Sequence, residues 1–265
     1  MSKIKKQKKI LIKKEVNKPF FSVVTVVKNA EKDILKTIKS LKNQKFKNFE
    51  YIVVDGKSED QTVKNILKNK KIINILISEK DKGIYFAMNK ALKFVNGEVI
   101  VFINAGDIFV KNALLKIYKK FRKNSEIDFV FGTVKRHYLE STILKYGFDI
   151  NRLKYNFDFA TSHSTGFFIK RKSFLKIGKF NLKYKCSADY DIYYKAIIKF
   201  KMRGDSTKKK QLIGEVSSGG FSSKFTFFQH LIEEMRIRID NKQNFFLIFL
   251  IFINALIKNL AKRLI

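Results

Sequence analysis

The chain has 265 residues, of which 56 are Lys or Arg and 23 are Asp or Glu, so its formal net charge at pH 7 is +33. Hydrophobic residues make up 45% of the chain and include 27 Phe, which is enough for a packed core and excludes a wholly disordered protein. The one cysteine, Cys186, excludes an intramolecular disulfide and a cysteine-rich zinc site.

The positive charge is carried almost entirely by lysines spread along the whole chain, beside abundant Ile, Asn and Phe. This pattern is typical of a compositional bias of the source genome. It also makes the surface attractive to nucleic acid, anionic lipid or phosphorylated small molecules. No module that interleaves aromatic and basic residues is present, so no specific nucleic-acid partner is expected.

The first predicted segment is a basic tail over residues 1–19. Seven lysines fall between Lys3 and Lys14, without the apolar core and small-residue cleavage site of a signal peptide. We expect a solvated tail, with contact to anionic lipid as the alternative.

Strands and helices then alternate. Apolar runs and helical periodicity predict strands at 20–27, 51–54, 72–77 and 98–103, and helices at 31–41, 60–67, 84–95 and 111–122. This order predicts an α/β fold with a mostly parallel central sheet flanked by helices. The chain continues as mixed strand and helix, so residues 20–242 are expected to form one domain.

The chain ends in a predicted amphipathic helix over residues 243–265. Residues 245–253 read FFLIFLIFI, and Asn254, Lys258 and Lys262 follow at every fourth position, with Asn259 and Arg263 alongside. On a helix these polar residues share one side. The apolar run is shorter than the about 20 residues that cross a bilayer. We therefore expect a helix lying in the membrane interface, and the alternative is a helix packed on the domain or on a second subunit.

Polar clusters follow the four predicted strands. They are Lys28-Asn29, Asp55-Gly56-Lys57-Ser58, residues 79–83 (EKDKG) and residues 104–107 (NAGD). Ligands of parallel sheets bind outside the carboxyl ends of the strands. The pattern therefore predicts a small-molecule site at this rim, without naming the molecule.

Two of these clusters carry a carboxylate directly after an apolar strand, at Asp55 and Asp107. Mg²⁺ and Mn²⁺ prefer oxygen ligands and usually take only one or two from protein when phosphate supplies others. Asp107 therefore qualifies as a metal ligand, with a capping role for the helix near Lys111 as the alternative. No phosphate loop, GxGxxG turn or GxSxG elbow is present, and His137, His163 and His230 lack metal-ligand spacing.

Seven segments in a fixed order resemble family 2 glycosyltransferases, which have the GT-A fold. The nucleotide-binding half, 20–125, contains SVVTVVKNA (22–30), YIVVDGKSEDQT (51–62), SEKDKGIYFAMNKAL (78–92) and GEVIVFINAGDIF (97–109). The acceptor half, 126–242, contains ATSHSTGFFIKRKSFLKIGKFN (160–181), CSADYDIYYKA (186–196) and SSGGFSS (217–223). The resemblance implies an inverting, metal-dependent enzyme that moves a sugar from a nucleotide-sugar, with UDP-sugars favoured, to a glycan hydroxyl. The expected context is bacterial surface polysaccharide or lipid-linked oligosaccharide assembly at the cytoplasmic face of the membrane.

The resemblance also assigns roles residue by residue. Asp55 would contact the uracil or ribose, with Asn29, Ser58 and Asp81 also on the nucleotide side. Asp107 would hold Mg²⁺ or Mn²⁺, and Asp189 would be the general base. The remaining expected residues near the donor and acceptor are Tyr85, Asn89, Asn104 and His163.

Two departures from the family pattern leave alternatives open. Asn104 and Gly106 replace acidic residues of the DxD-type motif, and Phe86 stands where similar sequences usually have Asp. The alternatives are a polyprenyl-phosphate glycosyltransferase and a catalytically impaired paralogue that binds sugar nucleotides. Asp189 has the alternative role of a helix N-cap, and Asp191 is expected to be structural. The sequence leaves the oligomeric state open.

Overall fold

The computed structural model describes residues 10–14, 16–138, 140–157 and 163–264. Its main sheet has the strand order β1-β4-β3-β2-β5-β10-β7-β11. The strands are β1 (Ile10–Lys13), β2 (Phe21–Val27), β3 (Phe49–Asp55), β4 (Ile75–Ser78), β5 (Val99–Phe102), β7 (Phe129–Phe131), β10 (Phe167–Lys170) and β11 (Gly204–Ser206). Strands β4, β3, β2 and β5 are parallel, whereas β1 and β10 run antiparallel to their neighbours. The predicted α/β fold with a mostly parallel central sheet is confirmed.

A second sheet has the order β6-β12-β8-β9. Its strands are β6 (Ile108–Phe109), β8 (Thr133–His137), β9 (Thr142–Lys145) and β12 (Leu212–Val216). Strand β6 follows directly after the 104–107 loop, and β12 ends just before Ser217. This sheet therefore brings the carboxyl end of β5 close to the segment that follows β12.

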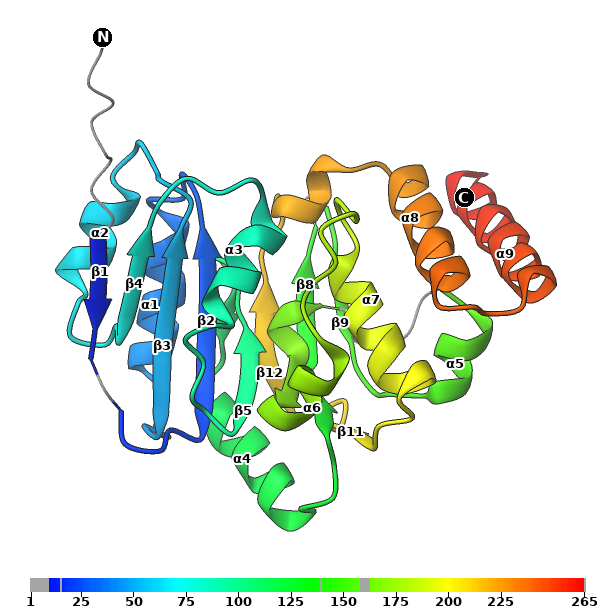
Figure 1. Ribbon diagram of the computed structural model, residues 1–265. Helices are drawn as coiled ribbons and strands as arrows, with labels where there is room; N and C mark the ends of the chain where they lie inside the picture. The colour runs from blue at the N-terminus through cyan, green and yellow to red at the C-terminus, as the bar shows by residue number, and fades with distance from the viewer. Residues whose placement is uncertain (1–9, 15, 139, 158–162, 265) are drawn as a thin grey trace, which may run out of the picture.

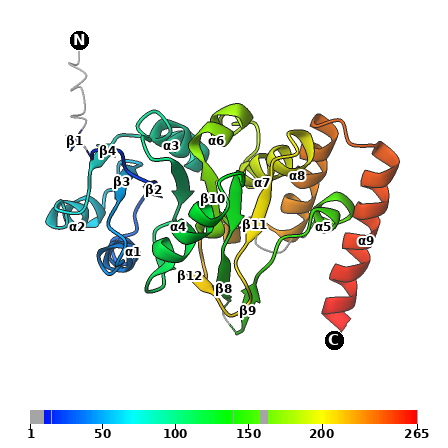
Figure 2. The same ribbon diagram turned by 90° about the horizontal axis from the view of Figure 1, so that it is seen from below.

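The helices cover both faces of the main sheet, as Figures 1 and 2 show. They are α1 (Asp33–Lys42), α2 (Thr62–Lys68), α3 (Ile84–Ala91), α4 (Ala113–Lys123), α5 (Ile150–Tyr155), α6 (Arg171–Ile177), α7 (Ala188–Tyr194), α8 (Phe227–Asp240) and α9 (Phe245–Leu264). Short 3-10 turns occur at Ser164–Gly166 and Phe221–Lys224, and a π-helical turn at Lys195–Lys199 extends α7.

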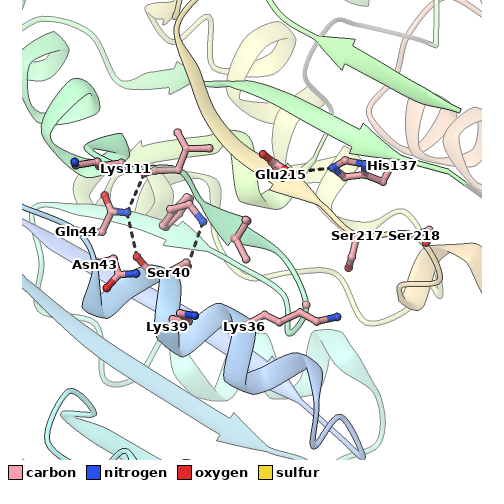
Figure 3. A pocket seen from close by; sticks show the side chains of 14 residues that line it. Lys36, Lys39, Ser40, Asn43, Gln44, Lys111, His137, Glu215, Ser217 and Ser218 are labelled. Carbon is pink, nitrogen blue, oxygen red and sulfur yellow. Dashed lines mark hydrogen bonds and ion pairs between the residues drawn. The ribbon is translucent and has the colours of Figure 1, made fainter.

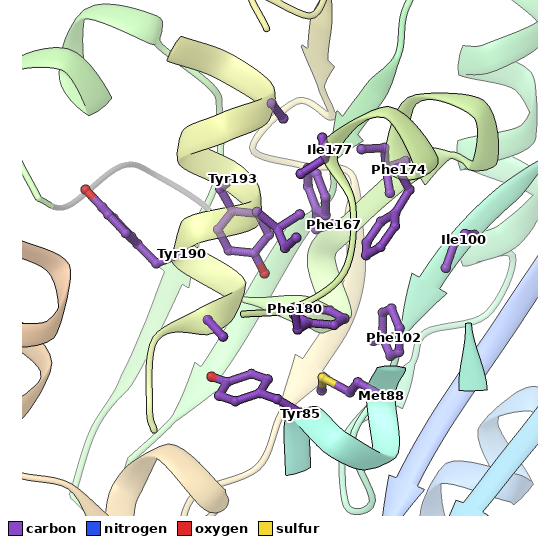
Figure 4. Close-up of a cluster of buried hydrophobic side chains, with 14 of the residues drawn as sticks. Tyr85, Met88, Ile100, Phe102, Phe167, Phe174, Ile177, Phe180, Tyr190 and Tyr193 are labelled. Atoms are coloured by element: carbon purple, nitrogen blue, oxygen red, sulfur yellow. The ribbon is translucent and has the colours of Figure 1, made fainter. Parts of the chain in front are cut away.

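The alternation of side chains along the strands builds two cores. On β2, Val24 and Val26 face the layer of α3, α6 and α7, whereas Val23 and Val27 face α1 and α4. The first layer is rich in aromatic rings, several of which Figure 4 shows around Phe102 and Phe180. Because successive side chains point to opposite faces, strands buried on both sides read as continuous apolar runs, as 20–27 does.

Several predicted bounds differ from the structure. The strand predicted at 72–77 begins at Ile75, because the chain is still turning at Ile72, whose N–H donates to the carbonyl of Asn69. The helix predicted at 84–95 ends at Ala91, where tight turns at Lys93 and Phe94 replace helical hydrogen bonds.

The N-terminal segment also differs from the expected tail. Residues 10–13 form β1, which pairs antiparallel with β4 and covers that edge of the sheet. The lysines between 3 and 9 lie outside the described residues, as do residues 160–162 of the acceptor motif and the side chains of Lys262 and Arg263. The predicted C-terminal helix is present as α9.

Candidate active site

The carboxyl end of β3 is closed by a hydrogen-bond network around Asp55. Its fully buried carboxylate accepts from the backbone N–H of Ser58 at 3.1 Å, the Ser58 hydroxyl at 2.5 Å and the Ser78 hydroxyl at 2.6 Å. The Ser58 hydroxyl oxygen in turn accepts from the N–H of Asn29 at 2.8 Å, and Asn29 adopts a left-handed φ of 48°. The predicted nucleotide-side residues Asn29, Asp55 and Ser58 thus form one rigid rim.

Asp81 lies in the loop after β4. One carboxylate oxygen pairs with Lys90, which also pairs with Glu79 at 2.7 Å. The other oxygen, Oδ2, is buried and has no hydrogen-bond partner in the structure. Buried polar atoms are nearly always satisfied, so this oxygen is suited to accept a hydrogen bond from a ligand.

Asp107 connects the loop after β5 with two segments that lie far from it in the sequence, around Thr165 and Ser217. Its side chain is almost fully buried; Oδ2 accepts from the Thr165 hydroxyl at 2.6 Å and Oδ1 accepts from the Ser217 N–H at 3.0 Å. The alternative capping role is wrong, because α4 begins at Ala113 after Asn112 and no side chain caps it. Thr165 and Ser217 are the contacts that sequence reasoning missed, although Ser217 opens one of the quoted segments.

The backbone conformation of the NAGD loop explains why residue 106 is a glycine. Gly106 has a φ of 99°, and a Cβ at this position would lie 2.8 Å from the Ser217 hydroxyl oxygen. An acidic residue would therefore be strained at this φ and would displace the Ser217 hydroxyl.

His163 and Asn104 lie beside Asp107. The Nδ1 atom of His163 is 3.8 Å from Oδ2 of Asp107 and accepts the N–H of Thr165 at 3.3 Å. Burial lowers the pKa of His163, with the charge of Asp107 opposing this effect, so the imidazole is neutral at pH 7. The side-chain N–H of Asn104 donates to the Ser164 hydroxyl at 3.3 Å, while its side-chain oxygen, Oδ1, is buried and has no hydrogen-bond partner in the part of the chain that the structure describes.

Two of these side chains offer oxygen ligands for a hard divalent cation. Mg²⁺ and Mn²⁺ prefer oxygen, which the Asp107 carboxylate and the side-chain oxygen of Asn104 supply. The Nδ1 atom of His163 already accepts the N–H of Thr165, so His163 is a neighbour of these oxygens rather than a further ligand. No group of three or more His, Cys, Asp or Glu placed to hold a metal occurs among the described residues.

Asp189 lies in the first turn of α7, where the phenol of Tyr85 donates to its Oδ1 at 3.4 Å. Burial raises the pKa of Asp189, and the nearby imidazole of His163 opposes this rise. Asp189 is not the N-cap of α7, which is Ser187. Asp191, expected to be structural, is buried and pairs with Lys195 at 2.6 Å.

Asn89 and Phe86 occupy α3. The amide of Asn89 uses both its groups on the backbone of Phe180, donating at 2.8 Å and accepting at 2.9 Å. It therefore ties α3 to the loop that leads to α7, and Tyr85 stacks on the ring of Phe180 at 5.7 Å (Figure 4). Phe86 is 37% exposed on the same helix.

Helix α8 supplies support that sequence reasoning missed. The carboxylate of Glu233 accepts from the consecutive N–H groups of Lys185, Cys186 and Ser187 at 2.6, 2.7 and 2.6 Å. These amides lead directly into α7, so Glu233 fixes the loop before Asp189. Its partners lie 46 to 48 residues away, and no local pattern reveals such a pairing.

An open groove of about 980 Å³ lies on the other side of the Asp107 loop (Figure 3). Lys36, Lys39 and Lys111 line it, and His137 pairs there with Glu215 at 2.9 Å. It touches the site only through Gly106 and Ser217, so the groove is a neighbour of the predicted site rather than its centre.

Comparisons with known proteins point to glycosyltransferases. The family described as "Glycosyl transferase family 2" matches residues 22–178. A PGL/p-HBAD biosynthesis glycosyltransferase of Mycobacterium bovis is 28% identical over 65% of this chain and 68% of its own length. A UDP-Glc:alpha-D-GlcNAc-diphosphoundecaprenol beta-1,3-glucosyltransferase of Escherichia coli is 34% identical over 42% of this chain and 44% of its own. Among solved structures, the fold is similar to that of S. aureus TarS 1-349 in complex with UDP-GlcNAc, with a TM-score of 0.68, 20% identity, and coverage of 89% of this chain and 71% of that one.

Proposed function

The chain belongs to glycosyl transferase family 2, and on that premise we propose that it moves a sugar from a nucleotide-sugar to a glycan hydroxyl with inversion at the anomeric carbon. The observation that carries the proposal is the cluster of Asp107, His163 and Asp189. One carboxylate stands beside a neutral imidazole, and a second, with a raised pKa, stands in hydrogen-bond contact with a phenol.

The donor nucleotide is assigned to the rim at the ends of β3 and β4. The rigid network of Asn29, Asp55 and Ser58 offers a preformed edge for the base and ribose, and the buried Oδ2 of Asp81 offers one further acceptor. A UDP-sugar is the favoured donor, because the E. coli relative is named for UDP-Glc and the TarS structure holds UDP-GlcNAc.

Asp189 is assigned as the general base. It accepts the proton of the acceptor hydroxyl while that oxygen attacks the anomeric carbon from the face opposite the leaving nucleoside diphosphate. A single displacement of this kind inverts the configuration. The raised pKa brings the base closer to the working pH, and Tyr85 orients the carboxylate.

Asp107, with the side-chain oxygen of Asn104 beside it, is assigned to a divalent cation, Mg²⁺ or Mn²⁺. When bound, the ion supplies positive charge against the diphosphate of the donor. Thr165 and Ser217 hold the Asp107 carboxylate in one orientation, so the ligand is preorganised.

The proposed place of action is the cytoplasmic face of a membrane, with a glycan carried on lipid as the acceptor. The name of the E. coli relative supports the lipid-borne acceptor, since that enzyme acts on a diphosphoundecaprenol saccharide. No helix in residues 10–14, 16–138, 140–157 and 163–264 is long and apolar enough to span a bilayer.

Thermal unfolding of the purified protein with UDP, GDP, CDP or dTDP, each with and without Mn²⁺, tests the donor assignment. A ligand that binds the folded state raises its stability by RT ln(1 + [L]/Kd). The proposal predicts a metal-dependent rise for one nucleotide, UDP first. No rise with any nucleotide would refute the donor assignment, and Phe86→Asp would then be the first variant to assay for regained binding.

A further inference from the structure

Helix α9 turns an apolar side to solvent. Phe245 is 71% exposed and Phe246 is 68% exposed. On a helix of 3.6 residues per turn, its exposed large apolar residues fall on one side, and between residues 245 and 260 no charged residue lies among them. They are Phe245, Phe246, Phe249, Leu250, Ile253, Ile257 and Leu260.

The opposite side of α9 faces the domain. Ile248 and Ile251 are buried in the core cluster that includes α8. Farther along, Asn254 and Lys258 both reach the Oδ1 atom of Asn156 after α5, at 3.4 and 3.5 Å. Both side chains are exposed, so these polar positions lie at the flank between the domain side and the apolar side. A surface helix of a soluble protein usually turns its polar side toward water, whereas the outward side of α9 is apolar.

Helix α8 adds to this surface. Figures 1 and 2 both show α8 and α9 side by side at one end of the molecule. We define the α8–α9 apolar face as the exposed residues of α9 named above together with Phe227, Phe228, Ile232 and Ile239 of α8. Clusters of exposed large apolar residues are typical of protein or membrane contacts.

We propose that the α8–α9 apolar face binds an anionic lipid bilayer, with α9 lying in the interface. Charge complementarity selects this occupant. Helix α9 has no Asp or Glu, and exposed Lys242 and Lys258 lie at its start and along its flank on a chain of net charge +33. Pairing two copies of the chain through this face would bring two molecules of net charge +33 together, and their electrostatic repulsion disfavours such a dimer.

Helix α8, which carries part of this face, also supports the loop that leads to the proposed base, Asp189 on α7. On its inner side, Glu233 accepts from the amides before α7, and the fully buried Arg238 donates to the phenol oxygen of Tyr190 at 2.6 Å. A bilayer on the outer side of α8 would therefore lie one helix away from Asp189. We infer lipid binding from the apolar face alone. The further step, that this arrangement presents a lipid-borne acceptor to Asp189, rests on the proposed function.

Sedimentation with vesicles tests the proposal. The full chain is mixed with phosphatidylcholine vesicles with and without phosphatidylglycerol, beside the F245S/F246S/F249S variant. The wild type should sediment with the anionic vesicles, less so at high salt, and the variant should lose affinity by about tenfold or more. The control L175S/I143S changes exposed apolar residues of α6 and β9, and it should bind like the wild type.

Three outcomes would overturn the proposal: no sedimentation of the wild type, unchanged binding of F245S/F246S/F249S, or equal binding to neutral vesicles. A wild-type dimer that this variant converts to a monomer in size-exclusion chromatography would instead assign the face to a second copy. Stabilisation by nucleotide without vesicles is measured in parallel. If lipid binding fails while nucleotide still stabilises the protein, only the role of the α8–α9 apolar face is refuted. If lipid binds while no nucleotide stabilises the protein, only the proposed function is refuted.

Discussion

The phenol oxygen of Tyr85 lies 3.4 Å from Oδ1 of Asp189, across 104 residues of sequence. Burial raises the pKa of both groups, with the charge of Asp189 adding to the rise at Tyr85. The phenol therefore stays protonated and donates to the carboxylate. This contact holds the carboxylate of the proposed base in one orientation.

Asp189→Asn should lower transfer by about 10²-fold or more, because the amide cannot take the acceptor proton. Nucleotide binding should stay unchanged, since the donor rim is built from other loops. Transfer is measured with a labelled nucleotide-sugar and binding by thermal shift. Asp205→Asn, which changes a partly buried ion pair with Lys120 away from the site, is the matched control. Normal turnover in Asp189→Asn would refute the base and favour an acceptor phosphate, which needs little base assistance.

Tyr85→Phe should shift the acidic limb of the kcat/KM profile to higher pH. The base is active when deprotonated, and loss of the phenol donor destabilises that form, so its pKa rises further above the ordinary value of an aspartate. A hydrogen bond of about 1 kcal/mol corresponds to about a fivefold loss of rate near the limb. An unshifted limb with a uniformly lower rate would mean that Tyr85 only packs on Phe180.

The local half of the site could be predicted from sequence. Apolar runs ending in Asp55 and in the NAGD loop mark strand ends, and parallel pairing brings those ends to one rim. Asp107 and Asp55 are therefore placed by short-range patterns. The predicted start of β4 and the predicted end of α3 were less accurate. Tight turns lie just before Ile75 and just after Ala91, and no strong breaking residue marks either turn in the sequence.

The partners of those residues could not be predicted in the same way. Thr165 and Ser217 reach Asp107 from segments 58 and 110 residues away, and Glu233 reaches the start of α7 from α8. Such contacts depend on how β10 and β12 insert beside β5 and β6, and that insertion is not written in the periodicity of any one segment.

Asp107→Ala should abolish the part of the nucleotide-induced thermal shift that requires Mn²⁺. The variant should also lose stability by about 1–3 kcal/mol, because Thr165 and the N–H of Ser217 lose their acceptor. Each shift is therefore measured against the unliganded variant. A metal-dependent shift of unchanged size would remove Asp107 from the proposed cation site.

Glu233→Gln should destabilise the protein by about 1–3 kcal/mol in chemical denaturation, because three consecutive N–H groups lose a charged acceptor. Transfer should also fall, since the loop before Asp189 loosens. Glu126→Gln is the control, because it removes only an exposed ion pair with Arg203 and should change stability by less than about 1 kcal/mol. Equal stability of the two variants would mean that Glu233 does not hold this loop.

The raised pKa of Asp189 also predicts a stability effect of opposite sign to its effect on activity. A carboxyl with a folded-state pKa above its unfolded value stabilises the fold below the unfolded pKa, and this contribution is lost as pH rises through the folded value. At pH 7 the wild type therefore carries a buried charge that Asp189→Asn removes. The variant should be more stable at pH 7 by about 0.5–2 kcal/mol, the usual gain of a stabilising substitution, and the gain should shrink toward pH 4. Urea denaturation at both pH values measures it, and a gain independent of pH would show that the charge of Asp189 is not its source.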